Sequence, residues 1–210
     1  MKFTEPMQPE RRNAIKALGS VVALSMTAGL LAACSPDKSA FKSIDLTGAD
    51  YAQGFSLPDH NGQTRTLKDF AGKIVVVFFG FTQCPDVCPT SMAELAQVKL
   101  QLGKDGDRLQ GIFITLDPER DTPELLKAYM ANFDPSFLAL RPTLAQLPQV
   151  SKDFKIYYKK VESKTPGSYT LDHSAGSYIY DTKGQLRLYS RYGAGAEALA
   201  SDIALLLKNH

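Results

Sequence analysis

The chain has 210 residues, of which 44% are hydrophobic and 22% are charged. This composition is typical of a folded globular protein and excludes a disordered chain, and the length suits one domain preceded by an export segment. The formal net charge is only +2, which gives no indication of nucleic acid or a strongly acidic surface as a partner.

Residues 1–33 predict a lipoprotein signal peptide. A basic stretch with paired arginines precedes an apolar run, and small residues then lead to Cys34. The Leu-Ala-Ala-Cys sequence that ends at Cys34 resembles a bacterial lipobox, in which the cysteine carries the lipid. We expect export by the Sec route or, given the paired arginines, by the twin-arginine route. An uncleaved membrane anchor is the alternative.

The segment that follows is expected to connect the lipid to the folded domain. Residues 34–50 are polar and lack sustained periodicity, which is typical of a flexible tether. The domain is predicted over residues 51–210. Without residues 1–33 the chain has twenty basic and twenty acidic residues, so the exported form is formally neutral. We expect it outside the cytoplasm, on the periplasmic side of a membrane and anchored there by lipid at Cys34.

The body of the chain alternates between strand and helix patterns. Buried strands are indicated by β-branched and aromatic runs, helices by apolar stripes, and turns by Asn-Gly and Lys-Gly. The expected elements are a hairpin over 55–67, strands over 74–79 and 109–116, a helix over 89–102, a helix from Pro123 capped by Thr122, a strand over 137–140, a helix over 143–153, strands over 177–180 and 186–189, and a helix over 196–208.

This alternation predicts an α/β domain, a three-layer sandwich with a central mixed sheet flanked by helices and with an N-terminal hairpin. The two remaining cysteines, Cys84 and Cys88, fall between the first central strand and its helix. That placement is typical of thioredoxin-like folds.

Cys84 and Cys88 predict a redox-active or metal-binding pair. They are too close in sequence for a disulfide between them to stabilise the fold much. At a helix N-terminus the i, i+4 spacing places both sulfurs on one face and favours thiolates. Two thiolates suit a soft ion such as Cu(I), but disulfide exchange needs the same groups. The pair alone therefore leaves both chemistries open.

A third ligand would favour the metal. Among the histidines, His210 is terminal and His60 lies in a hairpin loop, where a solvated role is expected. His173 lies just before the strand predicted over 177–180, where a thioredoxin fold usually carries a cis-proline facing the cysteine turn. A surface or capping role for His173 is the alternative, but the opposing cysteine pair favours a copper site.

A second polar cluster follows the strand predicted over 109–116. Parallel strands would bring its Asp117, Glu119 and Arg120 to the edge of the sheet that carries the cysteines. These residues are candidates for orienting the ligands or contacting a partner, although such a sequence also simply starts a helix. Asp86 and Asp172 are candidates for the same roles, and Asp172 or a water is a candidate fourth ligand for Cu(II).

Three segments together resemble the Sco/SenC family, whose members serve the synthesis of cytochrome c oxidase. The matching segments are 79–89 (FGFTQCPDVCP), 117–123 (DPERDTP) and 172–174 (DHS), and the resemblance covers about residues 48–208. It implies a copper metallochaperone of thioredoxin fold that binds copper, as Cu(I) or Cu(II), through Cys84, Cys88 and His173. It also implies a role in assembling the binuclear copper centre of the oxidase, with the oxidase subunit that carries this copper site as partner.

The same residues leave two other functions open. The chain would be an enzyme, with Cys84 and Cys88 as its catalytic residues, if it were a thiol–disulfide reductase that keeps the cysteines of the oxidase copper site reduced. It would be neither chaperone nor enzyme if it sensed copper or redox state. Other periplasmic copper chaperones and thioredoxin-like reductants are further candidate partners.

Overall fold

The computed structural model describes residues 40–162, 164 and 168–208, and all of them lie in one compact unit. The expected signal peptide, Cys34 and His210 lie outside the described residues. Within the described ranges, no helix combines the length and hydrophobicity needed to cross a bilayer.

A six-stranded mixed sheet forms the centre of the domain. Its strands, in spatial order, are β1 (Ile44–Asp45), β10 (Leu186–Ser190), β9 (Ser177–Tyr180), β4 (Ile74–Gly80), β5 (Leu109–Thr115) and β6 (Leu138–Leu140). Strands β4, β5 and β6 are parallel, whereas β9, β10 and β1 each run antiparallel to their neighbours. All residues of β4 and β5 are buried, as a strand covered on both faces requires.

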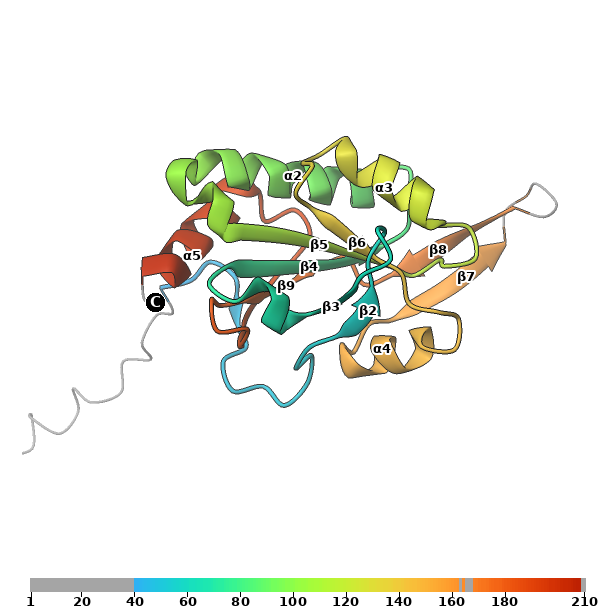
Figure 1. Ribbon diagram of the computed structural model, residues 1–210, viewed down its shortest axis with the longest axis horizontal. Coiled ribbons are helices and arrows are strands. Elements are labelled where there is room, and N and C mark those ends of the chain that lie inside the picture. The colour runs from blue at the N-terminus through green and yellow to red at the C-terminus, as the bar shows by residue number, and fades with distance from the viewer. Residues whose placement is uncertain (1–39, 163, 165–167, 209–210) are drawn as a thin grey trace, which may run out of the picture. The chain divides into compact units, whose positions relative to one another are not determined.

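Helices cover both faces of this sheet, which confirms the three-layer, thioredoxin-like α/β prediction (Figure 1). They are α2 (Val87–Gln101), α3 (Pro123–Ala131), α4 (Leu147–Asp153) and α5 (Ala196–Lys208), with short 3₁₀ helices at Leu67–Phe70 and Gly103–Arg108. Phe78 faces α2 and α5, and its neighbour Phe79 faces the end of α4, with its ring centroid 4.9 Å from that of Phe154. Consecutive residues of β4 thus pack against the helix layers on opposite faces of the sheet.

Two hairpins lie outside the central sheet. The predicted N-terminal hairpin is present as β2 (Ser56–Pro58) and β3 (Thr64–Thr66). The second, β7 (Tyr158–Glu162) and β8 (Tyr169–His173), was not predicted, because its residues are mostly polar or exposed. In Figure 1 this orange hairpin extends well beyond the end of the central sheet.

The start of the domain also differs from the prediction. Residues expected in the tether form β1 at the sheet edge, where Ile44 pairs with Tyr189. The preceding backbone is fixed by the buried carboxylate of Asp202 in α5, which accepts the amide hydrogens of Lys42 at 2.7 Å and Ser43 at 2.8 Å. The folded part therefore begins before residue 51.

Candidate metal centre

Cys84, Cys88 and His173 meet at the end of β4. Their ligand atoms, two sulfurs and one ring nitrogen, all lie within 4.8 Å of one another, and Cys88 Sγ is 3.6 Å from His173 Nε2. Metal bonds to sulfur and nitrogen are about 2.0–2.3 Å long, so three ligands of one ion must approach each other about this closely. The donor set and its spacing therefore fit a single soft metal ion.

The β4–α2 connection places the two sulfurs in different surroundings. Cys88 lies in the first turn of α2 and is fully buried, whereas Cys84 in the preceding turn is partly exposed. The amide hydrogen of Cys88 is directed at Cys84 Sγ, with N and S 3.4 Å apart. Burial raises the pKa of the Cys88 thiol, so metal binding there must displace a proton.

His173 is the last residue of β8, and its surroundings fix which ring nitrogen is free. Nδ1 is 2.8 Å from the carbonyl oxygen of Ser174. Because a carbonyl only accepts, Nδ1 carries the proton and the lone pair of Nε2 faces the sulfur of Cys88. Phe78 and Phe81 contact the ring edge-on, and burial lowers the pKa of His173, so the imidazole is neutral and able to bind metal at neutral pH.

One residue of the second polar cluster, Asp121, contacts the cysteine turn, a role that the sequence did not reveal. Asp121 is fully buried, and its carboxylate accepts hydrogen bonds from both the amide and the hydroxyl of Thr82 and from the hydroxyl of Thr115. Thr122 caps α3 as expected, accepting the amide hydrogen of Leu125.

The other predicted acidic and basic residues lie around the centre. Asp117 is buried and pairs with Arg120, while the exposed Glu119 pairs with Lys160. Asp86 is exposed and accepts a hydrogen bond from the hydroxyl of Thr90. Asp172 is exposed, and it is not among the grouped ligand atoms of the described residues.

His60 does not belong to this group. Nδ1 of His60 accepts the amide hydrogen of Ala139 at 3.1 Å, so this ring supports β6 instead of being solvated as expected.

A cleft of about 390 Å³ opens over the centre. Its walls come from the cysteine turn and from the hairpin of β7 and β8, and it is lined by Phe81, Cys84, Pro85, Asp86, Val87, Tyr157, Thr170, Leu171, Asp172, His173 and Ala175. Cys84 and His173 therefore face the cleft, while Cys88 lies behind them. The exposed ring of Tyr157 stands at its rim.

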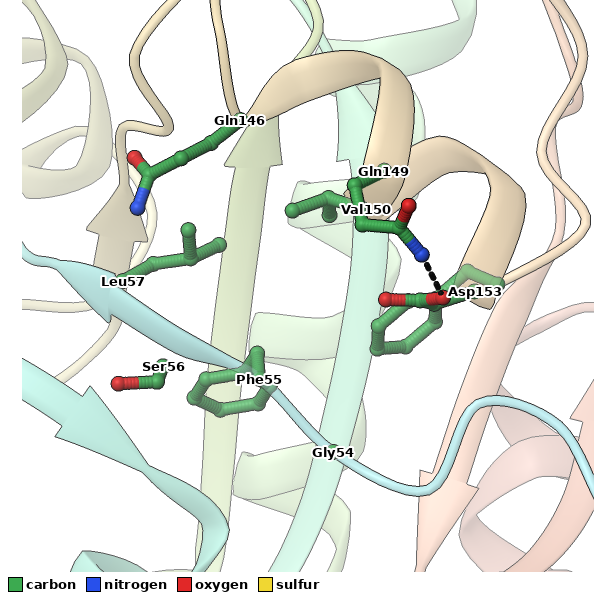
Figure 2. Close-up of a pocket in the computed structure, with 9 residues that line it drawn as sticks. Gly54, Phe55, Ser56, Leu57, Gln146, Gln149, Val150 and Asp153 are labelled. Atoms are coloured by element: carbon green, nitrogen blue, oxygen red, sulfur yellow. Dashed lines mark hydrogen bonds between the residues drawn. The ribbon is translucent and has the colours of Figure 1, made fainter.

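A larger cavity of about 490 Å³ lies elsewhere, between residues 54–57 and α4. Figure 2 shows Phe55 on one side of it and Val150 and Gln149 on the other, with Gln149 hydrogen-bonded to Asp153. None of the residues that line it is a candidate metal ligand. Its size alone gives it no chemical role, so the smaller cleft is the better candidate site.

Sequence comparisons relate the chain to one family. The model of the SCO1/SenC family matches residues 45–208. The mitochondrial SCO2 homologue of Bos taurus is 37% identical over 161 residues, which are 75% of this chain and 60% of that protein. The SCO2-like protein of Rickettsia prowazekii is 38% identical over 132 residues, 62% of this chain and 64% of that protein. The chain thus matches less than two thirds of the length of either relative.

Solved structures agree with this relationship. ScoI of Bradyrhizobium japonicum, with copper bound, has a TM-score of 0.66 and 40% identity, over 73% of this chain and 97% of that one. Yeast Sco1 with copper bound has a TM-score of 0.67 and 33% identity, over 75% and 88% of the two chains. Since the family model spans most of the sequence and the fold agrees, the chain belongs to the SCO1/SenC family.

Proposed function

We propose that this protein binds one copper ion through Cys84, Cys88 and His173 and delivers it to the copper-site subunit of cytochrome c oxidase during assembly of the binuclear centre. The observation that carries the proposal is the convergence of two sulfurs and an unprotonated ring nitrogen within 4.8 Å. The copper-bound relatives support the choice of metal, and the family resemblance supports the role in oxidase assembly.

The surroundings of the ligands suit copper in its soft, reduced form. Thiolate sulfur is a preferred ligand of Cu(I), and Phe78 and Phe81 shield the imidazole from water. Binding releases the proton of the buried Cys88 thiol, so affinity rises with pH while that thiol remains protonated in the free protein.

Delivery requires that a partner reach the ligands. The cleft exposes Cys84 and His173, so a soft ligand of the partner can bind copper from this side before the sulfur of Cys88 dissociates from the ion. Side chains beside the ligands, such as Val87 and the exposed ring of Tyr157, offer contact area to the partner's copper-binding segment. Other periplasmic copper chaperones would use the same face to load the site.

The cellular place of the protein is part of the proposal. The lipobox-like sequence supports lipidation of Cys34 after removal of residues 1–33 and attachment to the periplasmic side of a membrane. An extracytoplasmic position is also where a copper-site subunit would meet it.

A reductase function is the second candidate, favoured by the unequal exposure of the two cysteines. The Cys84 thiolate would attack a partner's disulfide and release one partner thiol, leaving a mixed disulfide. Cys88 would then attack Cys84 Sγ, releasing the second partner thiol and leaving Cys84 and Cys88 oxidised. A thioredoxin-like reductant must then restore the pair.

The two functions are separated by copper binding and transfer under reducing conditions. We expect one Cu(I) per wild-type protein, a large loss of affinity in Cys84→Ser, Cys88→Ser and His173→Ala, and transfer to the apo copper domain of the oxidase. His60→Ala is the matched control and should bind copper like the wild type. Disulfide turnover that needs both cysteines and ignores His173, without copper transfer, would instead establish the reductase.

A further inference from the structure

We propose that Arg120 is a positioning residue that holds His173 against the two cysteines by clamping the β7–β8 hairpin to the cysteine turn. This inference rests on the proposed copper function and deepens it. The guanidinium group of Arg120 contacts both Gln83, the residue before Cys84, and Tyr169 in β8, the strand that ends at His173.

The hairpin needs such a clamp because it is a separate two-stranded sheet. Strands β7 and β8 pair with each other and with no strand of the central sheet within the described residues. The bonds between Tyr157 and Ser174 at its base also stay inside the hairpin. Residues 174–176 join His173 to β9 through the backbone, but the rest of the hairpin can be fixed relative to the cysteines only through side chains.

Arg120 makes this connection with most of its guanidinium group. Nη1 donates to the side-chain oxygen of Gln83 at 3.0 Å and to the backbone oxygen of Tyr169 at 2.8 Å. Nε donates to the buried carboxylate of Asp117. The guanidinium carbon also lies 3.6 Å from the centroid of the Tyr169 ring, which is stacking distance.

Tyr169 also contacts the segment after β5 that carries Arg120. Its hydroxyl donates to the second oxygen of Asp117 at 2.8 Å, so Asp117 binds both Arg120 and Tyr169. The side chain of Asp117 is 1% exposed and that of Arg120 is 19% exposed, so solvent screens this cluster little. The neighbouring pair of Glu119 and Lys160 is about half exposed and contributes less.

Clamping Tyr169 orients His173 because both lie on one strand. Residues 169, 171 and 173 point to the same face of β8, and the buried Leu171 shows that this face is turned toward the domain. Holding the Tyr169 end of this short strand therefore fixes the register and the face that present His173.

The test is a double-mutant cycle with Arg120→Gln and His173→Ala. Cu(I) affinity is measured by competition with a chelator, and nitrogen coupling from His173 by electron paramagnetic resonance of the Cu(II) form. We expect Arg120→Gln to weaken copper binding by about tenfold, the low end of losses seen when a residue supporting a metal ligand is removed. In the His173→Ala background the same change should alter affinity less than about twofold.

The control is Arg108→Gln, since Arg108 makes only an exposed pair with Asp105 at 3.6 Å among the charged contacts of the described residues. It should bind copper like the wild type. Tyr169→Leu, on the exposed hairpin, removes the stacked ring and repeats the test if Arg120→Gln fails to fold. A purely structural role would lower the thermal stability of the apoprotein but leave the nitrogen coupling of folded protein unchanged.

Two results would overturn the clamp. One is an equal loss of affinity from Arg120→Gln with and without His173, because Arg120 would then act through the cysteines. The other is wild-type affinity together with wild-type nitrogen coupling in folded Arg120→Gln. Failure of the wild-type protein to bind copper would overturn the proposed function itself, which is a distinguishable outcome.

Discussion

Gly80 lies directly against the sulfur of Cys88. A side-chain carbon at position 80 would come within 2.8 Å of Cys88 Sγ and within 2.9 Å of the ring of Phe113, closer than such atoms approach in proteins. Glycine as the last residue of β4 therefore leaves space in the packed core for the sulfur of Cys88, a candidate metal ligand.

Gly80→Ala should displace the Cys88 sulfur and weaken copper binding. We also expect a loss of about 1–3 kcal/mol in the free energy of unfolding, as for other overpacked cores. Gly111→Ala is the matched control, because its added carbon would meet Phe137, the residue before β6, at 2.8 Å without touching the sulfur. Titration with Cu(I) and denaturant unfolding of both variants measure the two effects. Equal copper affinities would contradict the prediction.

The two cysteines should differ in reactivity in the reduced, metal-free protein. Cys84 faces the cleft, whereas Cys88 is buried and its thiol has a raised pKa because of that burial. Alkylation by iodoacetamide should therefore modify Cys84 at least about tenfold faster than Cys88. Peptide mass spectrometry over time measures this, with Cys84→Ser showing the rate of Cys88 alone. Comparable rates would mean that Cys88 is accessible in solution.

Asp121 should make the stability of the domain depend on pH. Burial raises the pKa of its carboxyl above the ordinary 3.8, so the folded state holds this proton more tightly than the unfolded state. The contribution of Asp121 to stability should therefore decrease as pH rises from 3.8 to the raised value, by at most about 1.4 kcal/mol per pH unit.

Unfolding of the wild type and of Asp121→Asn at several pH values measures this contribution, because the other titrating groups cancel in the difference. If the wild type instead gains stability relative to Asp121→Asn as the pH rises, the hydrogen bonds from Thr82 and Thr115 outweigh the effect of burial on the pKa of Asp121.

Asp202 should hold the start of the domain. Asp202→Ala leaves the amides of Lys42 and Ser43 without their acceptor, and hydrogen bonds to a charged group contribute about 1.5–3 kcal/mol each. We expect a loss of about 3 kcal/mol and faster hydrogen exchange in β1, with copper affinity unchanged. Glu197→Gln, on the exposed face of the same helix, is the control. Unchanged exchange at Lys42 and Ser43 would contradict this assignment.

The central layers of the fold and the three candidate ligands could be predicted because their signals are local. The continuous apolar run over 74–79 indicates a strand buried on both faces, and the cysteines follow it directly. The sequence singles out His173 because this histidine precedes a later strand of the sheet, although the structure places it at the end of β8.

The missed features depend on contacts between distant residues. In β7 apolar and polar residues do not alternate, and in β8 the alternation covers only five residues, of which Leu171 alone is buried, so the sequence signal for these strands is weak. Asp121 and Thr82 are 39 residues apart, and nothing in either local sequence indicates their hydrogen bonds. Strand β1 has only two residues, too few for any periodicity.

The separate hairpin gives the three donor atoms supports of unequal stiffness. Both sulfurs are anchored where the core strand β4 passes into α2, whereas the imidazole lies on a two-stranded ribbon that residues 174–176 join to β9 and that side chains otherwise hold to the domain. One donor can therefore leave the ion without breaking any hydrogen bond of the central sheet. We therefore expect the lifetime of a bound ion to be set by motion of the ribbon and not by unfolding of the core.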